Sequence, residues 1–236
     1  MKKKIVIFSG GMDSTTVLYH CVDSFRAKNV LAITFNYGSK HNEQEINKSI
    51  LTCAKLGVEQ RIFNLKDIFS NFNSALLKGG EDIPKGHYAD DNMKKTVVPF
   101  RNGVLLAIAV AFAEAENGNE VFYGAHLGDH DIYPDCRKDF VSAMNNAAMF
   151  GTYNNVQITA PYKDHNKILI LKQGIGLGVD YSLTWTCYEG KDRPCGKCGS
   201  CIERTEAFVE NGLKDPVYTD EEWIKAVNEY KKINVK

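Results

Sequence analysis

Short apolar runs alternate with longer amphipathic segments along most of this chain. The apolar runs have the length of buried strands and occur in this order: Lys4–Phe8, Val30–Phe35, Gln60–Leu65, Val121–Gly124 and Val156–Thr159. Other segments carry apolar residues at helical spacing and predict helices: Thr15–Phe25, Glu43–Leu56, Leu105–Ala115, Phe140–Met149, Ile168–Ile175, Ile202–Asn211 and Asp220–Lys232. Because strands and helices that alternate are typical of right-handed βαβ units, we expect an α/β fold with a parallel five-stranded sheet and helices on both faces.

The second expected helix has a clear apolar stripe. Residues at helical spacing lie on one face, and here they are Ile46, Ile50, Cys53, Ala54 and Leu56. Cys53, like Cys21, is expected to be a core residue.

The pattern fades between about Ser70 and Thr96, where Gly79, Gly80 and Pro84 indicate a long loop. Loops of this length in compact domains are usually functional covers, binding segments or disordered. A mobile cover over a ligand and a solvated surface insertion fit equally well. After this loop, Val97–Phe100 is expected to end as a strand from which Arg101 opens the next helix.

The segment Ser9–Ser14, with the sequence Ser-Gly-Gly-Met-Asp-Ser, joins the first expected strand to the first expected helix. A strand, a glycine turn and a helix N-terminus together direct backbone N–H groups and partial positive charge at an anion. Asp13 would repel a phosphate, but it fits a site in which a magnesium ion lies between them. The spacing is too short for the common P-loop and lacks its lysine. The segment therefore predicts a nucleotide site of another type, with a plain serine–glycine turn as the alternative.

Composition limits the possible functions. The 236 residues include 29 basic and 29 acidic residues, and 44% are hydrophobic, as in a globular protein with no charge imbalance that would attract nucleic acid. No apolar run approaches the roughly 20 residues of a membrane span, and the basic start at Met1–Ile5 is too short for a signal peptide. We therefore expect a cytoplasmic protein that binds neither membranes nor nucleic acid directly.

Four of the seven cysteines are close together in the sequence. Cys187 precedes the run Pro-Cys-Gly-Lys-Cys-Gly-Ser-Cys, which contains Cys195, Cys198 and Cys201. In a reducing compartment such a cluster predicts a metal site, and four thiolates around one ion form a structural zinc site. An iron–sulfur cluster takes the same ligands and stays an alternative, as do free buried cysteines. We expect a nucleotide-binding portion at residues 1–183 and a helical zinc-binding portion at residues 184–236, in one continuous domain.

Five stretches carry a more specific signal. They are Phe8–Ser14, Phe35–Gly38 with His41 and Glu45, Val98–Asn102, Tyr133–Arg137 with Asp129 upstream, and Thr184–Tyr188 before the cysteine run. Together they resemble the 7-cyano-7-deazaguanine synthases, a family of queuosine-pathway enzymes in the PP-loop, or N-type ATP pyrophosphatase, superfamily. The resemblance extends from the first strand to about Glu206.

This resemblance implies a fold, an activity and partners. The fold would be Rossmann-like, of the adenine nucleotide alpha hydrolase type, with one structural zinc ion per chain in a homodimer. The activity would be ATP-dependent conversion of 7-carboxy-7-deazaguanine and ammonia to 7-cyano-7-deazaguanine, with magnesium accompanying ATP. The ATP-binding segment would comprise Phe8, Ser9, Gly10, Gly11, Met12, Asp13, Ser14, Thr15, Thr16, Val17 and Leu18.

Three residues are expected to manage charge during catalysis. Asp13 would contact magnesium, and Lys167, where the family carries a lysine, would stabilise charge at the α-phosphate. Arg101 would meet phosphate or the substrate carboxylate. The alternatives are a solvated Lys167 at the start of a helix and an ion pair between Arg101 and a surface acid.

Substrate recognition is predicted from the chemistry of the ring. A guanine-like ring presents an N–H and an NH₂ group side by side, which one carboxylate can accept, and arginine is the natural bidentate partner of a carboxylate. We expect Asp135, or else Asp129, at the base edge and Arg137 at the substrate carboxylate. An internal Asp135–Arg137 pair is the alternative. The histidines His41, His126 and His130 lie near expected strand ends, as general bases or as polar loop residues.

Three other functions fit part of the sequence. A PP-loop enzyme that modifies tRNA would share the glycine turn and the metal site, although no basic stretch with interleaved aromatic residues is present. A close homologue could adenylate a different carboxylate. A non-catalytic zinc-bearing module could retain a degenerate nucleotide pocket.

Overall fold

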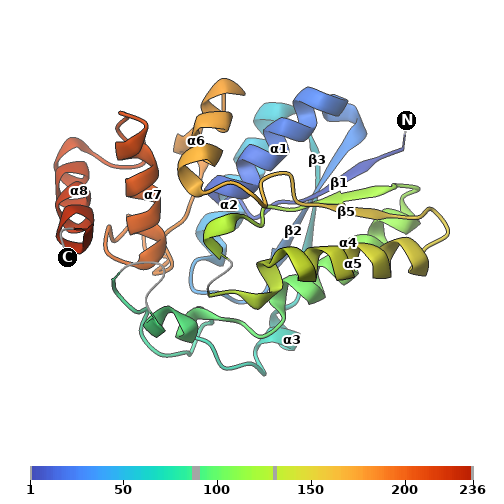
Figure 1. The fold of residues 1–236 in the computed structure, drawn as a ribbon, viewed down its shortest axis with the longest axis horizontal. Coiled ribbons are helices and arrows are strands. Elements are labelled where there is room, and N and C mark those ends of the chain that lie inside the picture. The colour runs from blue at the N-terminus through green and yellow to red at the C-terminus, as the bar shows by residue number, and fades with distance from the viewer. Residues whose placement is uncertain (1, 87–90, 130–131, 235–236) are drawn as a thin grey trace.

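A single parallel sheet forms the centre of the protein. The computed structural model describes residues 2–86, 91–129 and 132–234. The strands are β1 (Lys4–Ile7), β2 (Val30–Asn36), β3 (Glu59–Asn64), β4 (Glu120–Phe122) and β5 (Gln157–Thr159), and they pair in the order β3-β2-β1-β4-β5. Every pair is parallel, which confirms the expected five-stranded sheet (Figure 1).

Helices cover both faces of this sheet. On one side lie α1 (Met12–Phe25), α2 (Asn42–Leu56) and α6 (Lys167–Gly176), and on the other α4 (Arg101–Ala115) and α5 (Lys138–Gly151) (Figure 1). Adjacent residues of β1 show the alternation that produces this arrangement, because successive side chains of a strand point to opposite faces. Ile5 packs into the core beneath α4 and α5, whereas Val6 packs into the core beneath α1 and α6.

The C-terminal helices extend the fold at one end of the sheet. Helix α7 (Gly199–Glu210) packs against α6, and α8 (Asp220–Asn234) packs against α7 (Figure 1). Met12 and Leu171 share a small core with Phe208 of α7, so this portion is anchored to the helix that follows the glycine turn. The shorter helices are α3 (Lys66–Phe69) and the 3₁₀ turns Ala27–Asn29, Asp91–Thr96, Leu127–Asp129, Pro134–Cys136 and Tyr181–Leu183. No helix among the described residues has the length and apolar character needed to span a membrane.

Helix α2 does not bury the stripe that the sequence predicted. Ile50 is 45% exposed, while Glu45, Ser49 and Thr52 are buried together with Cys53. The buried polar groups have partners: the Gln60 amide donates to the Ser49 hydroxyl at 2.7 Å. The apolar face that the spacing indicates is therefore not the buried face of this helix, because the inward face meets polar groups.

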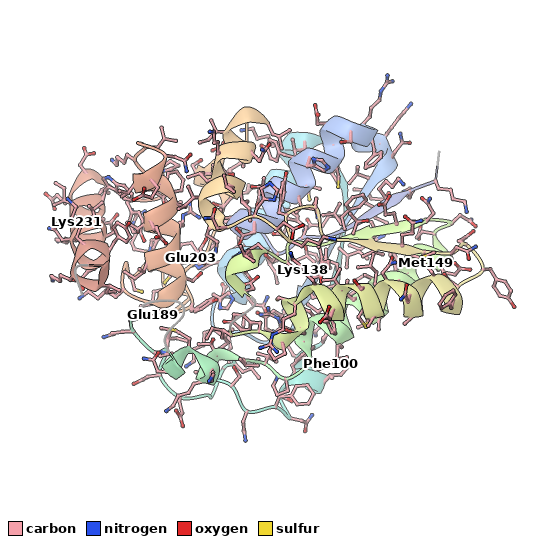
Figure 2. The ribbon with its side chains drawn as sticks, viewed as in Figure 1. Phe100, Lys138, Met149, Glu189, Glu203 and Lys231 are labelled. Atoms are coloured by element: carbon pink, nitrogen blue, oxygen red, sulfur yellow. The ribbon has the colours of Figure 1, made fainter. Side chains whose placement is uncertain are left out.

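The residues before α4 also differ from the prediction. Residues 97–100 form no strand: residues 99–100 are in a turn, and the N–H of Arg101 donates to the carbonyl of Val98 at 3.2 Å. Phe100 adopts a left-handed backbone with φ of 52° and leaves its side chain 60% exposed (Figure 2). The helix begins at Arg101, as expected.

The long segment around residues 70–96 forms no strand where it is described, apart from isolated bridges. It is nevertheless packed, since Leu76 and Met93 are each 1% exposed. The segment is therefore not a solvated insertion along its whole length. Residues 87–90 lie outside the described part of the chain, and a role as a mobile cover stays a prediction.

Candidate functional site

A cavity of about 200 Å³ lies beyond the carboxyl ends of the strands, where ligands bind in open parallel sheets. The glycine turn and the first residues of α4 and α6 contribute to its wall, together with the segments that follow β2 and β4. Aromatic side chains line part of it: Tyr37, Tyr123, Tyr133, Trp185 and Tyr188. The cavity therefore combines polar groups of the glycine turn with aromatic rings on which a flat ligand could stack.

The glycine turn has the geometry of an anion site. Helix α1 begins at Met12, with Gly11 as its N-cap and no side chain capping it, so the first N–H groups have no partner within the helix. The Ser9 hydroxyl accepts from the N–H of Gly11 at 3.0 Å and faces the Ser14 hydroxyl at 3.1 Å. Gly10 has φ of 92°, and a Cβ there would lie 2.3 Å from the Glu45 carbonyl oxygen, so no other residue fits this position.

Lys167 is the buried cation of the site. It is the first residue of α6 and 5% exposed, and its Nζ lies 2.6 Å from Glu203 Oε2 and 3.3 Å from Asp13 Oδ2. Burial lowers the pKa of Lys167, but Asp13 and Glu203 more than offset this effect and keep the pKa above its usual value. The alternative of a solvated lysine is wrong. Glu203, which lies on α7 and faces α6 (Figure 2), was not singled out from the sequence.

Asp13 carries an unused oxygen. Its Oδ1 is buried and has no hydrogen-bond partner among the described residues, whereas Oδ2 faces Lys167 and lies 3.7 Å from His126 Nε2. A buried carboxylate oxygen without a partner is unfavourable unless a ligand satisfies it. Because carboxylate oxygens are preferred ligands of magnesium, Asp13 fits the expected ion.

His126 links two of the predicted acids. It is 1% exposed, and its Nδ1 accepts from the N–H of Gly128 at 3.1 Å. Its Nε2 therefore carries the proton in the neutral ring and lies 3.5 Å from Asp129 Oδ2. Asp129 lines the cavity beside it. His130 lies outside the described residues.

Arg101 also lines the cavity. Its Nη1 donates to the Tyr37 hydroxyl at 3.3 Å, and the guanidinium lies 5.6 Å from the centre of the Tyr37 ring. Among the described residues, no acid forms an ion pair with Arg101 within 4.0 Å, so the alternative of a surface ion pair is not supported. Its position agrees with the expected contact to an anionic ligand.

Asp135 and Arg137 do not line the cavity. Asp135 is buried, and its Oδ2 accepts from the N–H of Asn102 at 2.8 Å, which caps the N-terminus of α4. Arg137 is exposed and precedes α5 as its N-cap residue. Cys136 between them faces the cavity, with its Sγ accepting from the Asn102 amide at 3.1 Å. Of the three expected substrate residues, Asp129 alone borders this cavity, and substrate contacts of the other two stay predictions.

The four clustered cysteines come together as expected. The sulfur atoms of Cys187, Cys195, Cys198 and Cys201 all lie within 4.8 Å of one another. Backbone N–H groups of Lys197 and Cys198 donate to the Cys195 sulfur at 3.4 and 3.3 Å, an arrangement that favours thiolates. The cluster therefore has the ligands and the spacing to hold a metal ion. Cys21 and Cys53 are core residues, as predicted, and burial raises the pKa of Cys53 to about 12.

This cluster also supports one wall of the cavity. Trp185 and Tyr188 flank Cys187, and Ser200 lies between Cys198 and Cys201, and these three neighbours all line the cavity. The N–H of Trp185 donates to the carbonyl of Gly10 at 2.9 Å. The segment that leads into the four-cysteine cluster is thus joined directly to the glycine turn.

The chain is similar to known proteins along most of its length. A family model described as "Queuosine biosynthesis protein QueC" matches residues 3–212. The 7-cyano-7-deazaguanine synthase of Pseudoalteromonas atlantica is 47% identical over 217 residues, which cover 92% of this chain and 98% of that protein. The synthase of Methanoregula boonei is 49% identical over 215 residues, covering 91% and 98%.

Solved structures share the fold at low identity. NMN synthetase from Francisella tularensis aligns with a TM-score of 0.51 at 11% identity, over 98% of this chain and 84% of that one. The U34-tRNA thiolase NcsA from Methanococcus maripaludis, solved with its 4Fe–4S cluster, aligns with a TM-score of 0.50 at 17% identity, over 98% and 72%. These likenesses support the Rossmann-like architecture. Because the family match and the curated relatives extend along most of its length, this chain belongs to the queuosine biosynthesis protein QueC family.

Proposed function

We propose that this protein converts 7-carboxy-7-deazaguanine and ammonia to 7-cyano-7-deazaguanine at the expense of ATP; its relatives are named as synthases of this product. One observation carries the proposal for this chain. The uncapped start of α1, the buried Lys167 and the half-free Asp13 carboxylate all border one cavity that also has aromatic walls. Such a cavity suits a polyphosphate next to a flat heterocycle.

The glycine turn would hold the phosphates that leave as pyrophosphate. In this proposal, the ATP-binding segment is Phe8–Leu18, and the N–H groups at the start of α1 neutralise the β- and γ-phosphates. Asp13 Oδ1 would hold magnesium, which supplies additional charge neutralisation at the phosphates. Lys167, kept charged by Asp13 and Glu203, would stabilise negative charge at the α-phosphate.

The substrate would occupy the rest of the cavity. Rings such as those of Tyr37 and Tyr188 offer stacking surfaces for a deazaguanine. Asp129 would accept from the guanine-like edge, while His126 orients its carboxylate. Arg101 would hold the substrate carboxylate near the α-phosphate, since arginine binds carboxylates with two parallel hydrogen bonds.

The chemistry needs positioning more than a side-chain nucleophile. A carboxylate oxygen attacks the α-phosphorus, pyrophosphate leaves, and an acyl adenylate forms. Ammonia then displaces AMP to give the amide, and a second adenylation at the amide oxygen allows that oxygen to leave with AMP as the nitrile forms. In this scheme the protein accelerates the reaction mainly in two ways: it holds the reacting atoms together, and it neutralises the charge of the phosphates.

The metal and the assembly complete the proposal. Four thiolates with no position left open fit a structural zinc ion, which would fix the wall formed by Trp185 and Tyr188. We place the enzyme in the cytoplasm as a homodimer that uses free ammonia and binds no nucleic acid directly. An iron–sulfur cluster in place of zinc would be recognised by its visible absorption and iron content.

The decisive experiment is a reconstituted reaction. The protein is incubated with ATP, magnesium, ammonium and 7-carboxy-7-deazaguanine, and products are identified by mass, with each component omitted in turn. Nitrile formation that requires all four supports the proposal. Pyrophosphate release with a different carboxylate alone, or salt-dependent tRNA binding with modification of the RNA, would replace it.

A further inference from the structure

Glu45 is a buried acid beside the glycine turn. It lies in the first turn of α2, and its side chain is 12% exposed and lines the same cavity as Asp13 and Lys167. Its Oε1 lies 3.5 Å from the point where a Cβ on Gly11 would stand. The carboxyl group is therefore next to the place where the proposed function puts the phosphates.

This acid lacks the strong cation that its neighbours have. Asp13 and Glu203 both face the Lys167 ammonium, whereas in the described part of the chain no lysine or arginine nitrogen lies within 4.0 Å of Glu45. Its contact with a basic side chain is to His41, whose Nε2 lies 3.6 Å from Glu45 Oε2. Burial, together with the charge of Arg101, lowers the pKa of His41 to about 3, so the ring is neutral near pH 7.

A carboxyl group in this setting exchanges protons near neutral pH. Burial raises the pKa of Glu45 to about 8, although Arg101 and the Ser9 hydroxyl lower it in part. A group whose pKa lies near the working pH is suited to general acid–base catalysis. The neutral His41 does not neutralise this carboxyl group, whereas Asp13 and Glu203 both contact the Lys167 ammonium.

The reaction of the proposed function releases protons from nitrogen. When ammonia attacks the acyl adenylate, the C–N bond forms, the C–O bond to AMP breaks with its electron pair, and a proton must leave the nitrogen. Adenylation of the amide oxygen releases one amide N–H proton as the imidate forms. When this imidate becomes the nitrile, the C–O bond to AMP breaks with its electron pair and the last nitrogen proton leaves. Among the roles assigned above to Asp13, Arg101, Asp129 and Lys167, none accepts these protons.

We propose that Glu45 binds the nitrogen nucleophile and accepts its protons in both nitrogen steps. Its oxygen accepts a hydrogen bond from the attacking nitrogen, and the proton moves to this carboxylate as the C–N bond forms. The same carboxylate takes the N–H proton when the nitrile forms, and bulk water regenerates it. The inference rests on the proposed function, because it assigns a residue to that reaction.

The test separates adenylation from the nitrogen steps. Adenylation is measured as carboxylate-dependent exchange of labelled pyrophosphate into ATP, without ammonium. Amide formation is measured at increasing ammonium concentrations, and nitrile formation from the supplied amide and ATP. Trapping of the acyl adenylate by hydroxylamine, which is largely unprotonated at neutral pH and needs less help from a base, gives a fourth readout.

Glu45→Gln keeps the shape and removes the proton acceptor. We expect pyrophosphate exchange and hydroxamate formation within a few-fold of wild type, while amide and nitrile formation each fall by about 100-fold or more, the usual scale of general base catalysis. Glu43→Gln is the matched control, because Glu43 lies in the same turn of α2 and is exposed, and it should retain all four activities.

Two outcomes would overturn the inference while leaving the proposed function intact. Wild-type rates of amide and nitrile formation in Glu45→Gln would show that no proton passes to this carboxyl. An equal fall in pyrophosphate exchange would show that Glu45 only supports the glycine turn. If Glu45→Gln does not fold, Glu45→Asp gives the same separation, because the shortened acid should keep exchange and lose nitrogen transfer. Absence of exchange in the wild type would overturn the proposed function and this inference together.

Discussion

The Nζ atom of Lys167 lies 3.3 Å from Oδ2 of Asp13, although the two residues are 154 positions apart in the chain. This contact joins the start of α6 to the start of α1. Oε2 of Glu203, on α7, lies 2.6 Å from the same Lys167 Nζ. A buried ion pair of this kind is weak evidence of stability by itself. Its position at the cavity points to a lysine held charged for use on a ligand.

Removing the Lys167 charge should damage both activity and stability. In Lys167→Met, the buried Glu203 and the half-buried Asp13 lose their common cation, and breaking a buried pair typically costs up to about 3–5 kcal/mol of unfolding free energy. Carboxylate-dependent pyrophosphate exchange should fall about 100-fold or more, because a positioned charge near the reacting phosphate is lost. Denaturant unfolding and the exchange assay measure the two effects. Lys172→Met on the exposed side of α6 is the control, and equal effects of both substitutions would refute the role of Lys167.

Gly10 should tolerate no side chain. In Gly10→Ala, the new Cβ would meet the Glu45 carbonyl oxygen at 2.3 Å in a left-handed backbone, so the turn must open. We expect nucleotide affinity to fall by at least about tenfold, measured by calorimetry with ATP and magnesium. Gly57→Ala tests the strain alone, because Gly57 has φ of 66° but no atom within 4 Å of the new Cβ. A similar loss of ATP binding in Gly57→Ala would contradict this explanation.

Metal loss should disturb the cavity. Cys195→Ser removes one of four thiolates, and because structural metal sites contribute folding energy, we expect the bound metal per chain and the unfolding temperature to fall together. Elemental analysis and calorimetry measure both, and iron in the analysis would replace zinc in the assignment. Cys53→Ala, in the core of the other face, should keep the metal. Activity unchanged in a metal-free Cys195→Ser protein would show that the cluster does not support the cavity wall.

Stability should depend on pH through Glu45 and His41. The pKa of Glu45 is raised from 4.5 to about 8, so between these values the folded state binds more protons than the unfolded state and stability falls as pH rises. The pKa of His41 is lowered from 6.5 to about 3, so its contribution rises with pH over that range and opposes the first. Between about pH 6.5 and 8 only the Glu45 contribution remains of the two. Urea unfolding across this range should show a decline in the wild type that Glu45→Gln reduces, and an unchanged slope would contradict the pKa assignment.

Local patterns in the sequence were enough to predict the framework. The alternation of apolar runs and amphipathic segments predicted all five strands and the helices between them, because burial of a strand or a helix face requires a period that the residues themselves carry. The glycine turn and the cysteine cluster were equally readable, since each depends on residues close in the chain. Even here Phe100 was misassigned to a strand end, because a left-handed turn there depends on the packing that follows.

The tertiary structure decided which polar groups meet. Nothing near Lys167 in the sequence predicts its burial, which results from Asp13 and Glu203 on two distant helices. Asp135 lies outside the cavity lining and caps α4, since its Oδ2 accepts from the N–H of Asn102 at 2.8 Å, and its expected contact with the substrate stays a prediction. Glu45 faces inward from a helix whose apolar Ile50 faces solvent. The period of apolar residues indicates which side chains of a segment face the core and which face solvent. A ligand cavity is a third environment. Which side chains line the cavity is determined only by the packing of segments that are distant in the sequence.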